Sequence, residues 1–214
     1  MNSSENDCTH GVSLVETIRV TDGTFRHLPL HIDRMRRSCL ELYGTPPPAL
    51  RLTERDVPPD LRQGDVKCRV VYSTDIVSIA YTRYTPRTIR TLRTVTDDSA
   101  DYHLKFSDRS RLETLAARKG EADEILIVRN GLVTDTSFSN ILCVCGDMWL
   151  TPAQPLLRGV MRQRLIEEGR AIEADITPDM LRAGNRAGIT AVILINAMLP
   201  PGKIPPIPLT RIIQ

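Results

Sequence analysis

The sequence predicts an α+β protein made of two halves, of which the second is richer in strands. Alternating apolar and polar residues over 12–20 predict a half-buried strand, and the apolar spacing over 32–42 is helical. A polar break over 96–104 separates this part from a series of short apolar runs bounded by turn residues. We therefore expect a small α+β domain over 1–98 and a larger strand-rich domain over 99–214.

The first half is expected to combine strands with one long helix. The first strand ends before the turn pair Asp22-Gly23, and the helix that follows ends at Gly44, because three prolines come soon after it. Residues 45–65 are expected to form a connection with a short helix near 51–56. The remaining strands of this half are expected at 66–72, 76–83 and 87–95.

In the second half, turn signals separate the expected elements clearly. Ser107 is expected to cap a helix that ends at Gly120, and Arg129-Asn130-Gly131 turns one strand into the next. A further helix is expected from about Gly159, and Thr177-Pro178 has the pattern of a helix start. The strands are expected at 125–128, from 132 onwards, and at 139–144, 148–150 and 191–195.

The composition is that of a soluble globular protein and excludes several classes. Of the 214 residues, 41% are hydrophobic and 25% charged, so a mostly disordered chain is excluded. No apolar run reaches the ~18–20 residues of a membrane span. The net charge of +2 favours neither nucleic acid nor a membrane surface as partner. An odd number of cysteines favours reduced thiols and a cytoplasmic location, and no residues have the spacing of a metal site.

Three segments carry candidate functional residues. For two of them, a purely structural role is an alternative. Lys105 lies between apolar neighbours after the polar break, where a desolvated amine is a nucleophile; the alternative is a surface lysine. Asp135 follows a strand, and a buried carboxylate there needs a positive partner, such as a protonated ring nitrogen. The alternative is an aspartate that binds its own turn. Gly159 opens a helix whose backbone amides would suit a phosphate.

Six segments, taken in order, resemble the class IV aminotransferase family, the pyridoxal-phosphate enzymes of fold type IV. They are LVETIRV, HIDRM, LKFSDR, ADEILIVRNGLVTDTSFSNI, LLRGVMRQ and INAM, and they cover about 12–200. The resemblance implies a two-domain fold like that of D-amino-acid aminotransferase, with a trimmed N-terminal domain. It also implies a homodimer that binds pyridoxal 5'-phosphate and a small amino-acid-like substrate.

The resemblance implies a role for each matching residue. Lys105 matches the lysine that carries the cofactor as a Schiff base and moves the proton. Arg34 matches the arginine that binds the cofactor phosphate. Asp135 stands opposite the pyridine nitrogen, where most members have glutamate. The other residues expected at the cofactor are Asn140, Leu156, Val160, Met161 and Asn196, with the amides of Val160 and Met161 at the phosphate.

Three details resemble the 4-amino-4-deoxychorismate lyase branch of the family. They are Thr17 in VETIR, the segment KFSDR that begins at Lys105, and Asn196-Ala197-Met198. The resemblance implies a β-elimination that gives pyruvate and 4-aminobenzoate, a folate precursor. Lys105 would remove the proton and Thr17 would assist its transfer. The alternatives are a class IV aminotransferase of branched-chain or D-amino acids, and a cofactor-binding relative without activity.

The sequence also departs from the family pattern. The usual first strands are missing, and a short hairpin replaces the Gly/Arg-rich stretch after the strand at 67–71. That stretch recognises the substrate carboxylate in the family, so other cations are needed for this role. Arg83, Arg87 and Arg109 are candidates on the basis of charge alone.

Overall fold

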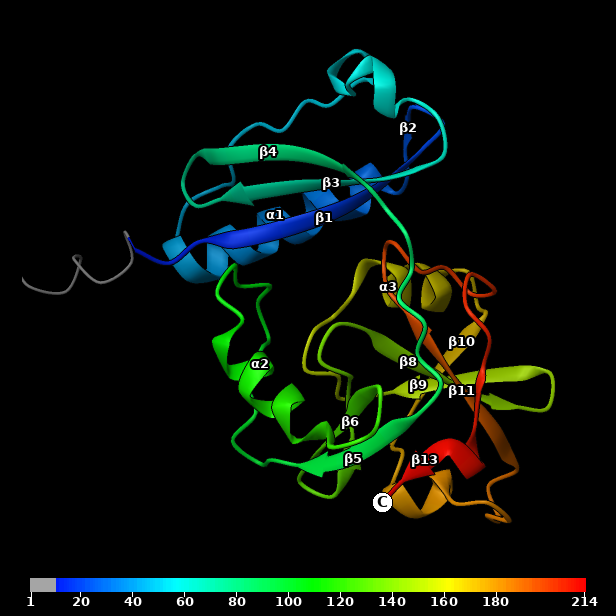
Figure 1. Cartoon of the computed structure of the whole chain (residues 1–214). Helices are drawn as coiled ribbons and strands as arrows, with labels where there is room; N and C mark the ends of the chain where they lie inside the picture. Colours follow the sequence, from blue (N-terminus) through cyan, green and yellow to red (C-terminus); the bar gives the residue numbers. More distant parts are fainter. Residues whose placement is uncertain (1–10) are drawn as a thin grey trace, which may run out of the picture. The chain divides into compact units, whose positions relative to one another are not determined.

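The computed structural model describes residues 11–214, which form two compact units (Figure 1). The first unit comprises the chain up to Thr85 together with Leu104–Asp108, and the second comprises Pro86–His103 and Arg109–Gln214. The boundary expected between residues 98 and 99 falls inside the second unit. The physical reason is that 92–96 pairs with a strand of the second unit, whereas 105–107 returns to pair with the first.

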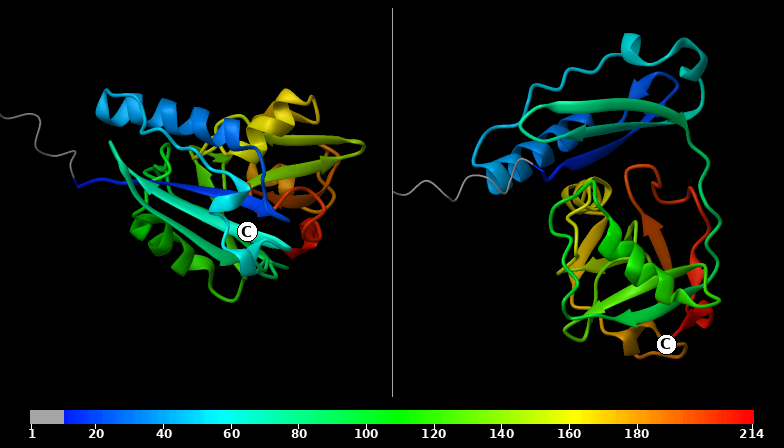
Figure 2. Two further views of the ribbon diagram at one scale, coloured as in Figure 1. Left: turned by 90° about the horizontal axis from the view of Figure 1, so that it is seen from above. Right: turned by 60° about the vertical axis from the view of Figure 1, so that its left-hand side comes forward.

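An antiparallel sheet and one long helix make up the first unit. The sheet has the order β2-β1-β3-β4, and α1 packs on one of its faces (Figure 2). Leu14, Ile18 and Val20 of β1 face the helix, where they meet Met35 and Cys39 in a buried core. The bounds are β1 Leu14–Thr21, β2 Thr24–Phe25, α1 Leu28–Tyr43, η1 Glu54–Asp56, η2 Pro59–Leu61, β3 Asp65–Tyr72 and β4 Ile76–Arg83.

Helix α1 ends as predicted but begins earlier than the apolar spacing indicates. Its C-cap is Gly44, whose φ of 67° lies in the left-handed region that glycine adopts without strain. At the other end His27 is the N-cap and Pro29 lies in the first turn, so the helix adds about one turn before His31. The two-residue strand β2, which the sequence analysis missed, pairs with the end of β1.

The second unit holds two sheets, as expected for its strand-rich sequence. One has the order β13-β5-β6-β7 and the other β10-β9-β8-β11-β12. The bounds of the strands are β5 Leu92–Thr96, β6 Glu124–Arg129, β7 Leu132–Val133, β8 Asn140–Cys145, β9 Met148–Pro152, β10 Ala171–Ala174, β11 Ile189–Ile195, β12 Ile207–Pro208 and β13 Ile212–Ile213. The helices are α2 Ser110–Ala116, η3 Ala117–Lys119, α3 Val160–Glu167, η4 Pro178–Leu181 and η5 Leu209–Arg211.

Two local predictions are wrong in detail. Ser107 does not cap α2, whose N-cap is Arg109; its hydroxyl instead bonds the hydroxyl of Ser13, 94 residues earlier. Strand β5 begins only at Leu92. The helix start expected at Thr177-Pro178 is confirmed, because Thr177 is the N-cap of η4 and Pro178 is its first residue. The short strands β10, β12 and β13 were not predicted, because their pairing depends on distant partners.

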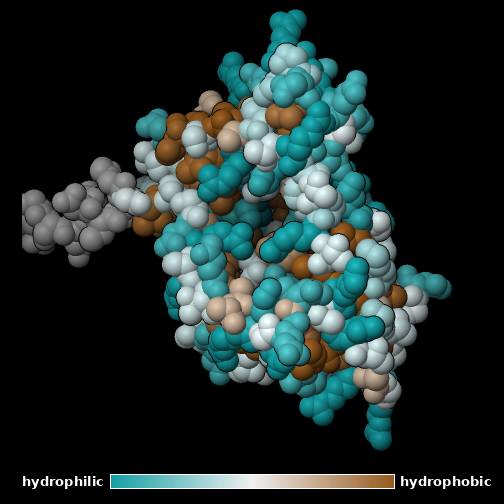
Figure 3. Space-filling view, viewed as in Figure 1, coloured by the Kyte–Doolittle hydropathy of each residue, from teal (hydrophilic) through white to brown (hydrophobic). Residues whose placement is uncertain are grey.

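The surface mixes polar and apolar residues (Figure 3). Among the most exposed apolar side chains is Val77 of β4, with 62% of its surface accessible, and Ile79 of the same strand is also exposed. Of the helices that the structure describes, none combines the length and apolar character needed to cross a membrane.

Candidate functional site

A buried ionic cluster joins β1 to α1 in the first unit. Glu16 is fully buried on the helix-facing side of β1. Arg34 donates from Nε to Oε1 at 2.8 Å and from Nη2 to Oε2 at 2.5 Å, a two-point contact that fixes the guanidinium. The Nδ1 atom of His31 lies 2.6 Å from Oε2 of the same carboxylate. Glu16 therefore orients Arg34, the residue predicted to bind phosphate.

The charges of this cluster follow from its partners. Burial alone would raise the pKa of Glu16, but Arg34 and His31 outweigh it and lower that pKa to about 2. The pKa of His31 is lowered, chiefly by burial and further by the charges of Arg34 and Lys105. Neutral His31 therefore donates its Nδ1–H to Glu16, and its buried Nε2 has no partner among the described residues.

Lys105 belongs to a segment that extends the edge of β1. Its carbonyl accepts a hydrogen bond from the Val15 backbone at 2.9 Å, and Phe106 bridges to Leu14. The positive charge of Lys105 is close enough to lower the pKa of His31. The structure thus brings Lys105 near the Glu16–Arg34–His31 cluster, although 71 residues separate Lys105 from Arg34 in sequence.

Thr17 lies on the other face of β1. Side chains alternate along a strand, so Thr17 points away from the helix-facing side that Glu16 occupies. It is half-buried and stands directly opposite Arg69 of β3 in the antiparallel register. Thr17 and the Glu16 carboxylate that binds Arg34 therefore lie on opposite faces of the same sheet.

Asp135 is the central charged group of the second unit. The residue is only 4% exposed. Its carboxylate accepts one hydrogen bond from Asn140 Nδ2 and another from the Leu157 backbone N–H, each at 2.8 Å. Burial raises the pKa of Asp135 to about 6, and these two bonds oppose that rise. The side chain thus bonds a backbone amide 22 residues away, which disfavours the alternative of a local turn aspartate.

Asn140 links Asp135 to the start of α3. Its Nδ2 also donates to the Leu157 carbonyl at 2.8 Å, so both of its amide hydrogens are used. Its Oδ1 points at Gly159, where an added Cβ would come within 2.0 Å of that oxygen. Only glycine fits at residue 159, because any side chain would collide with the amide that supports Asp135.

The predicted phosphate residues lie next to this group. Helix α3 begins after Gly159 without a side-chain cap, so its first backbone N–H groups remain for another acceptor. Val160 and Met161 form this first turn, and the side chains of Leu156, Val160 and Met161 are buried. Within the second unit, the structure therefore brings together Asp135, Asn140, Leu156, Val160 and Met161.

Asn196 is largely occupied by structural bonds. Its Oδ1 accepts from the backbone amides of Met198 and Leu199, at 2.8 and 3.0 Å. Its Nδ2 donates to the Phe138 carbonyl at 3.2 Å, which leaves one amide hydrogen for a ligand. Asn196 thereby fixes the 134–139 loop that carries Asp135, a supporting task that the sequence analysis did not anticipate.

The three arginines chosen by charge all have protein partners. Arg83 donates to the carbonyls of Asp60 and Gln63. Arg87 lies 4.6 Å from the Phe138 ring centroid and 3.7 Å from the Glu124 carboxylate, and Arg109 donates to the Ser137 carbonyl at 2.8 Å. These contacts show what each arginine does within its own unit.

Glu16 and His31 were not predicted as site residues. One signal was present, since Glu16 occupies a position that the alternation of β1 assigns to the core, between Leu14 and Ile18. A carboxylate at such a position needs a charged partner. The identity of that partner was not readable, because Arg34 and His31 lie on a separate element.

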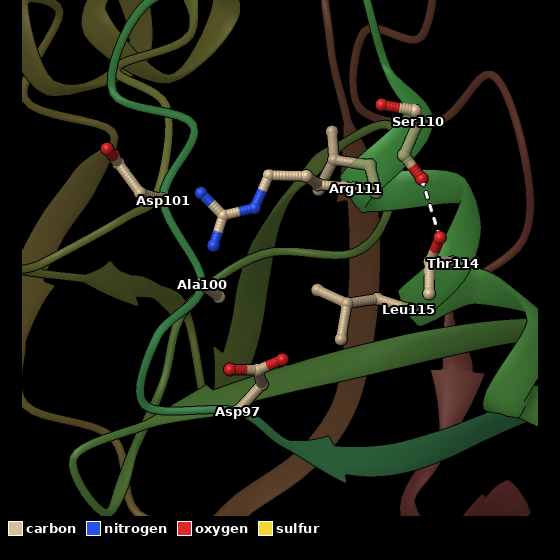
Figure 4. A pocket seen from close by; sticks show the side chains of 8 residues that line it. Asp97, Ala100, Asp101, Ser110, Arg111, Thr114 and Leu115 are labelled. Atoms are coloured by element: carbon tan, nitrogen blue, oxygen red, sulfur yellow. Dashed lines mark hydrogen bonds between the residues drawn. The ribbon is translucent and has the colours of Figure 1, made fainter.

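A surface pocket between α2 and the 97–101 loop is separate from these residues (Figure 4). Arg111 extends from α2 toward this loop and donates to the Ser99 carbonyl at 3.1 Å. None of the residues predicted for the cofactor lines the pocket. Within residues 11–214, no three His, Cys, Asp or Glu side chains come together as a metal-binding group.

Comparison with known proteins shows which family the chain matches. The amino-transferase class IV family matches residues 13–200. A protein of Haemophilus influenzae strain Rd, itself uncharacterized, is 34% identical over 189 residues, which are 86% of this chain and 97% of that protein.

Solved structures resemble the chain as well. A Haemophilus somnus 129PT protein, provisionally named 4-amino-4-deoxychorismate lyase, is 33% identical with a TM-score of 0.76 and covers 88% of this chain and 97% of its own. The Escherichia coli branched-chain amino acid aminotransferase shares the fold, with a TM-score of 0.70 and 18% identity over 96% of this chain and 78% of its own. A hypothetical Mycobacterium tuberculosis aminotransferase in PLP-bound form has a TM-score of 0.67 and 19% identity, over 99% and 86%.

Proposed function

Because the chain belongs to the class IV aminotransferase family and is an enzyme of that class, we propose that it is a lyase of the 4-amino-4-deoxychorismate type. The cofactor is pyridoxal 5'-phosphate. The substrate would lose pyruvate by β-elimination and leave 4-aminobenzoate. The observation that carries the cofactor assignment is Asp135, a carboxylate buried and oriented by two donors.

The residues present fit this cofactor at both of its charged ends. In the first unit, Glu16 holds the Arg34 guanidinium, which suits a phosphate. In the second unit, considered by itself, the first turn of α3 offers backbone N–H groups of the kind that bind phosphate. At the ring end, the burial that raises the pKa of Asp135 makes ionisation costly without a cation, so a protonated pyridine nitrogen is a matching partner. The bound cofactor supplies an electron sink for the carbanion formed at the substrate.

The chain's own groups would handle the protons of the elimination. Lys105 would carry the cofactor and, once released by the substrate amine, take the proton from the carbon that bears the amino group. The bond between the ring and the ether oxygen then breaks, and the leaving enolpyruvate needs one proton to become pyruvate. The Thr17 hydroxyl would relay that proton and would regain it from Lys105, so the proton taken from the substrate ends on pyruvate. No second substrate is needed, and formation of the aromatic ring drives the release.

Two assays on the same preparation distinguish lyase activity from aminotransferase activity. The lyase should release pyruvate from 4-amino-4-deoxychorismate in the absence of any oxo acid. An aminotransferase should instead require an oxo-acid acceptor and show ping-pong kinetics. Turnover only with an acceptor would overturn the proposed lyase activity and leave the family unchanged. A protein that binds cofactor and fails both assays would be a relative without activity.

We also propose that the enzyme is a cytoplasmic homodimer that acts in folate biosynthesis. The family resemblance supports this assembly, and the free thiols Cys39, Cys68, Cys143 and Cys145 suit a reducing compartment. Light scattering of the cofactor-loaded protein at micromolar concentration should give twice the 24.0 kDa of one chain. The mass of a single chain would contradict the dimer.

A further inference from the structure

One face of the first unit's sheet carries an unusual row of cations. Alternation along β1 and β3 places a set of side chains on the face opposite α1, here called the Thr17 face. Its cations are Arg19, Lys67 and Arg69, and all three are half-buried. The full set is Val15, Thr17, Arg19 and Thr21 of β1, with Asp65, Lys67, Arg69 and Val71 of β3.

The strand register places these cations close together, and their repulsion lowers the stability of the first unit. Arg19 stands directly opposite Lys67, and Arg69 follows Lys67 by two residues on the same strand and the same face. Like charges directly opposite each other destabilise a sheet. Partial burial adds to the cost, because water screens the repulsion less. An anion placed between these cations would remove the penalty.

The described part of the first unit supplies little negative charge to this face. In the part of the chain that the structure describes, none of the three cations lies within ion-pair distance of a carboxylate. Asp65 is the acidic residue of this face, and it accepts a hydrogen bond from Thr21 at 2.8 Å at the far end from Thr17. Three cations against one carboxylate leave the face positive.

Arg69 is the cation of this row nearest to the proposed chemistry. Residues directly opposite in an antiparallel pair have Cβ atoms about 4.5–5.5 Å apart, and Arg69 is directly opposite Thr17. A carboxylate bound to the Arg69 guanidinium would therefore lie beside the Thr17 hydroxyl. Arginine binds carboxylate through two parallel hydrogen bonds, so it also sets the orientation of the group.

We propose that Arg69 binds the carboxylate of the departing 2-oxo-acid portion of the substrate, with Lys67 and Arg19 adding positive charge behind it. This inference rests on the proposed function, in which Thr17 protonates that same portion. Arg69 would then determine specificity. A substrate with a carboxylate on its leaving portion would neutralise the positive charge of this face, whereas a branched apolar amino acid would leave that charge without a counter-ion.

The test uses the cofactor-loaded enzyme and two matched charge removals. Arg69→Gln removes the proposed carboxylate ligand. Arg55→Gln is the control, because Arg55 is exposed in η1 and its side chain has no described contact. In Arg69→Gln, the KM for 4-amino-4-deoxychorismate should rise about tenfold or more, as for loss of a charge-assisted hydrogen bond. Arg55→Gln should match the wild type, and Arg69→Lys should recover part of the loss.

A binding measurement separates the two proposals. Pyruvate is the probe, titrated by calorimetry into the cofactor-loaded protein, and its dissociation constant should rise about tenfold in Arg69→Gln. The melting temperature of that variant should stay equal or increase, because a like charge has been removed; a purely structural arginine would lower it. If the wild type binds pyruvate through Arg69 but fails to turn over the substrate, the lyase proposal fails and this site stands. Equal pyruvate affinity and equal KM in wild type and Arg69→Gln would overturn the site.

Discussion

Asp135 accepts two hydrogen bonds from groups that can only donate in this geometry, the Asn140 amide nitrogen and the Leu157 backbone N–H. An asparagine in its place would turn its own NH₂ toward one of them and lose that bond, at a cost of about 1–3 kcal/mol. It would also remove a buried charge, which offsets part of this cost. The fold should therefore survive Asp135→Asn.

Catalysis by Asp135→Asn should fall steeply, by about 100-fold or more, because no charge remains to keep a ring nitrogen protonated. The measurement is the turnover rate on an accepted substrate, with cofactor occupancy checked by absorbance. Asp135→Glu is the companion variant and should keep partial activity, since it restores the residue usual in the family. Near-normal turnover of Asp135→Asn at full occupancy would remove Asp135 from the site.

The charge of Lys105 acts on His31, which shares the Glu16 carboxylate with Arg34, the residue proposed to bind the phosphate. The other lysines have different settings: Lys67 lies on β3, and Lys119 donates to the Asp123 carbonyl at 3.2 Å. Borohydride reduction of the cofactor-loaded enzyme, followed by peptide mapping, should place the pyridoxyl label on Lys105. A label on Lys67, Lys119 or Lys203 would contradict the assignment.

At the scale of the element, the start of α3 depends on a contact rather than on a backbone angle. Gly159 has a φ of −72°, which any residue can adopt, yet a Cβ there would lie 2.0 Å from Asn140 Oδ1. Asn140 cannot move aside without breaking its bonds to Asp135 and Leu157. Gly159→Ala should therefore destabilise the protein by about 1–3 kcal/mol and weaken cofactor binding.

The control for this substitution is Gly11→Ala. An added Cβ at Gly11 meets nothing within 4 Å, so the same chemical change should leave urea unfolding and cofactor titration at wild-type values. If Gly159→Ala behaves like Gly11→Ala in both measurements, then the Asn140–Gly159 contact does not support the site.

The elements also show what the sequence could and could not specify. The strand β1 and the end of α1 were predictable, because alternation and the Gly44 stop are local signals. Ser107 was misassigned because it has the residue type of a cap, whereas its hydroxyl is used by Ser13. The two-residue strands β12 and β13 were missed, since their existence depends on partners on other segments of the chain.

The predicted site divides in the same way. Asp135 and Asn140 lie five residues apart, so the segment that carries both was recognisable. The bond from Asp135 to Leu157 and the fixing of Arg34 by Glu16 arise between separate elements, and no local pattern encodes them. Residue types could be inferred from the segments; their partners required the fold.

At the scale of the whole molecule, the two units should respond to acid in opposite directions. In the first unit, the pKa of Glu16 is lowered to about 2 and that of His31 is also lowered. Groups with a lowered pKa stabilise the fold above their unfolded values, and this stability is lost as the pH falls through the folded values. The first unit should therefore weaken below about pH 6.5, and further below about pH 4.5.

Asp135 gives the second unit the reverse behaviour. Its folded pKa of about 6 lies above the unfolded value, so the folded state takes up the proton first and gains stability as the pH falls from about 6 to about 4. A difference of about two pKa units corresponds to on the order of 3 kcal/mol. This applies to the cofactor-free protein, in which the charge of Arg162 offsets only part of the effect of burial on the Asp135 carboxylate.

The single tryptophan makes this opposition measurable. Trp149 lies on β9, so its fluorescence follows the second unit, while far-ultraviolet circular dichroism follows both. In urea, the cofactor-free protein at pH 5 should show a Trp149 transition later than the dichroism midpoint, by a wider margin than at pH 7. Asp135→Asn should abolish the part of this shift that comes from the second unit, because it has no proton to gain. If the difference between the fluorescence and dichroism midpoints is the same at pH 5 and pH 7, then the buried carboxyl groups do not set the relative stability of the units.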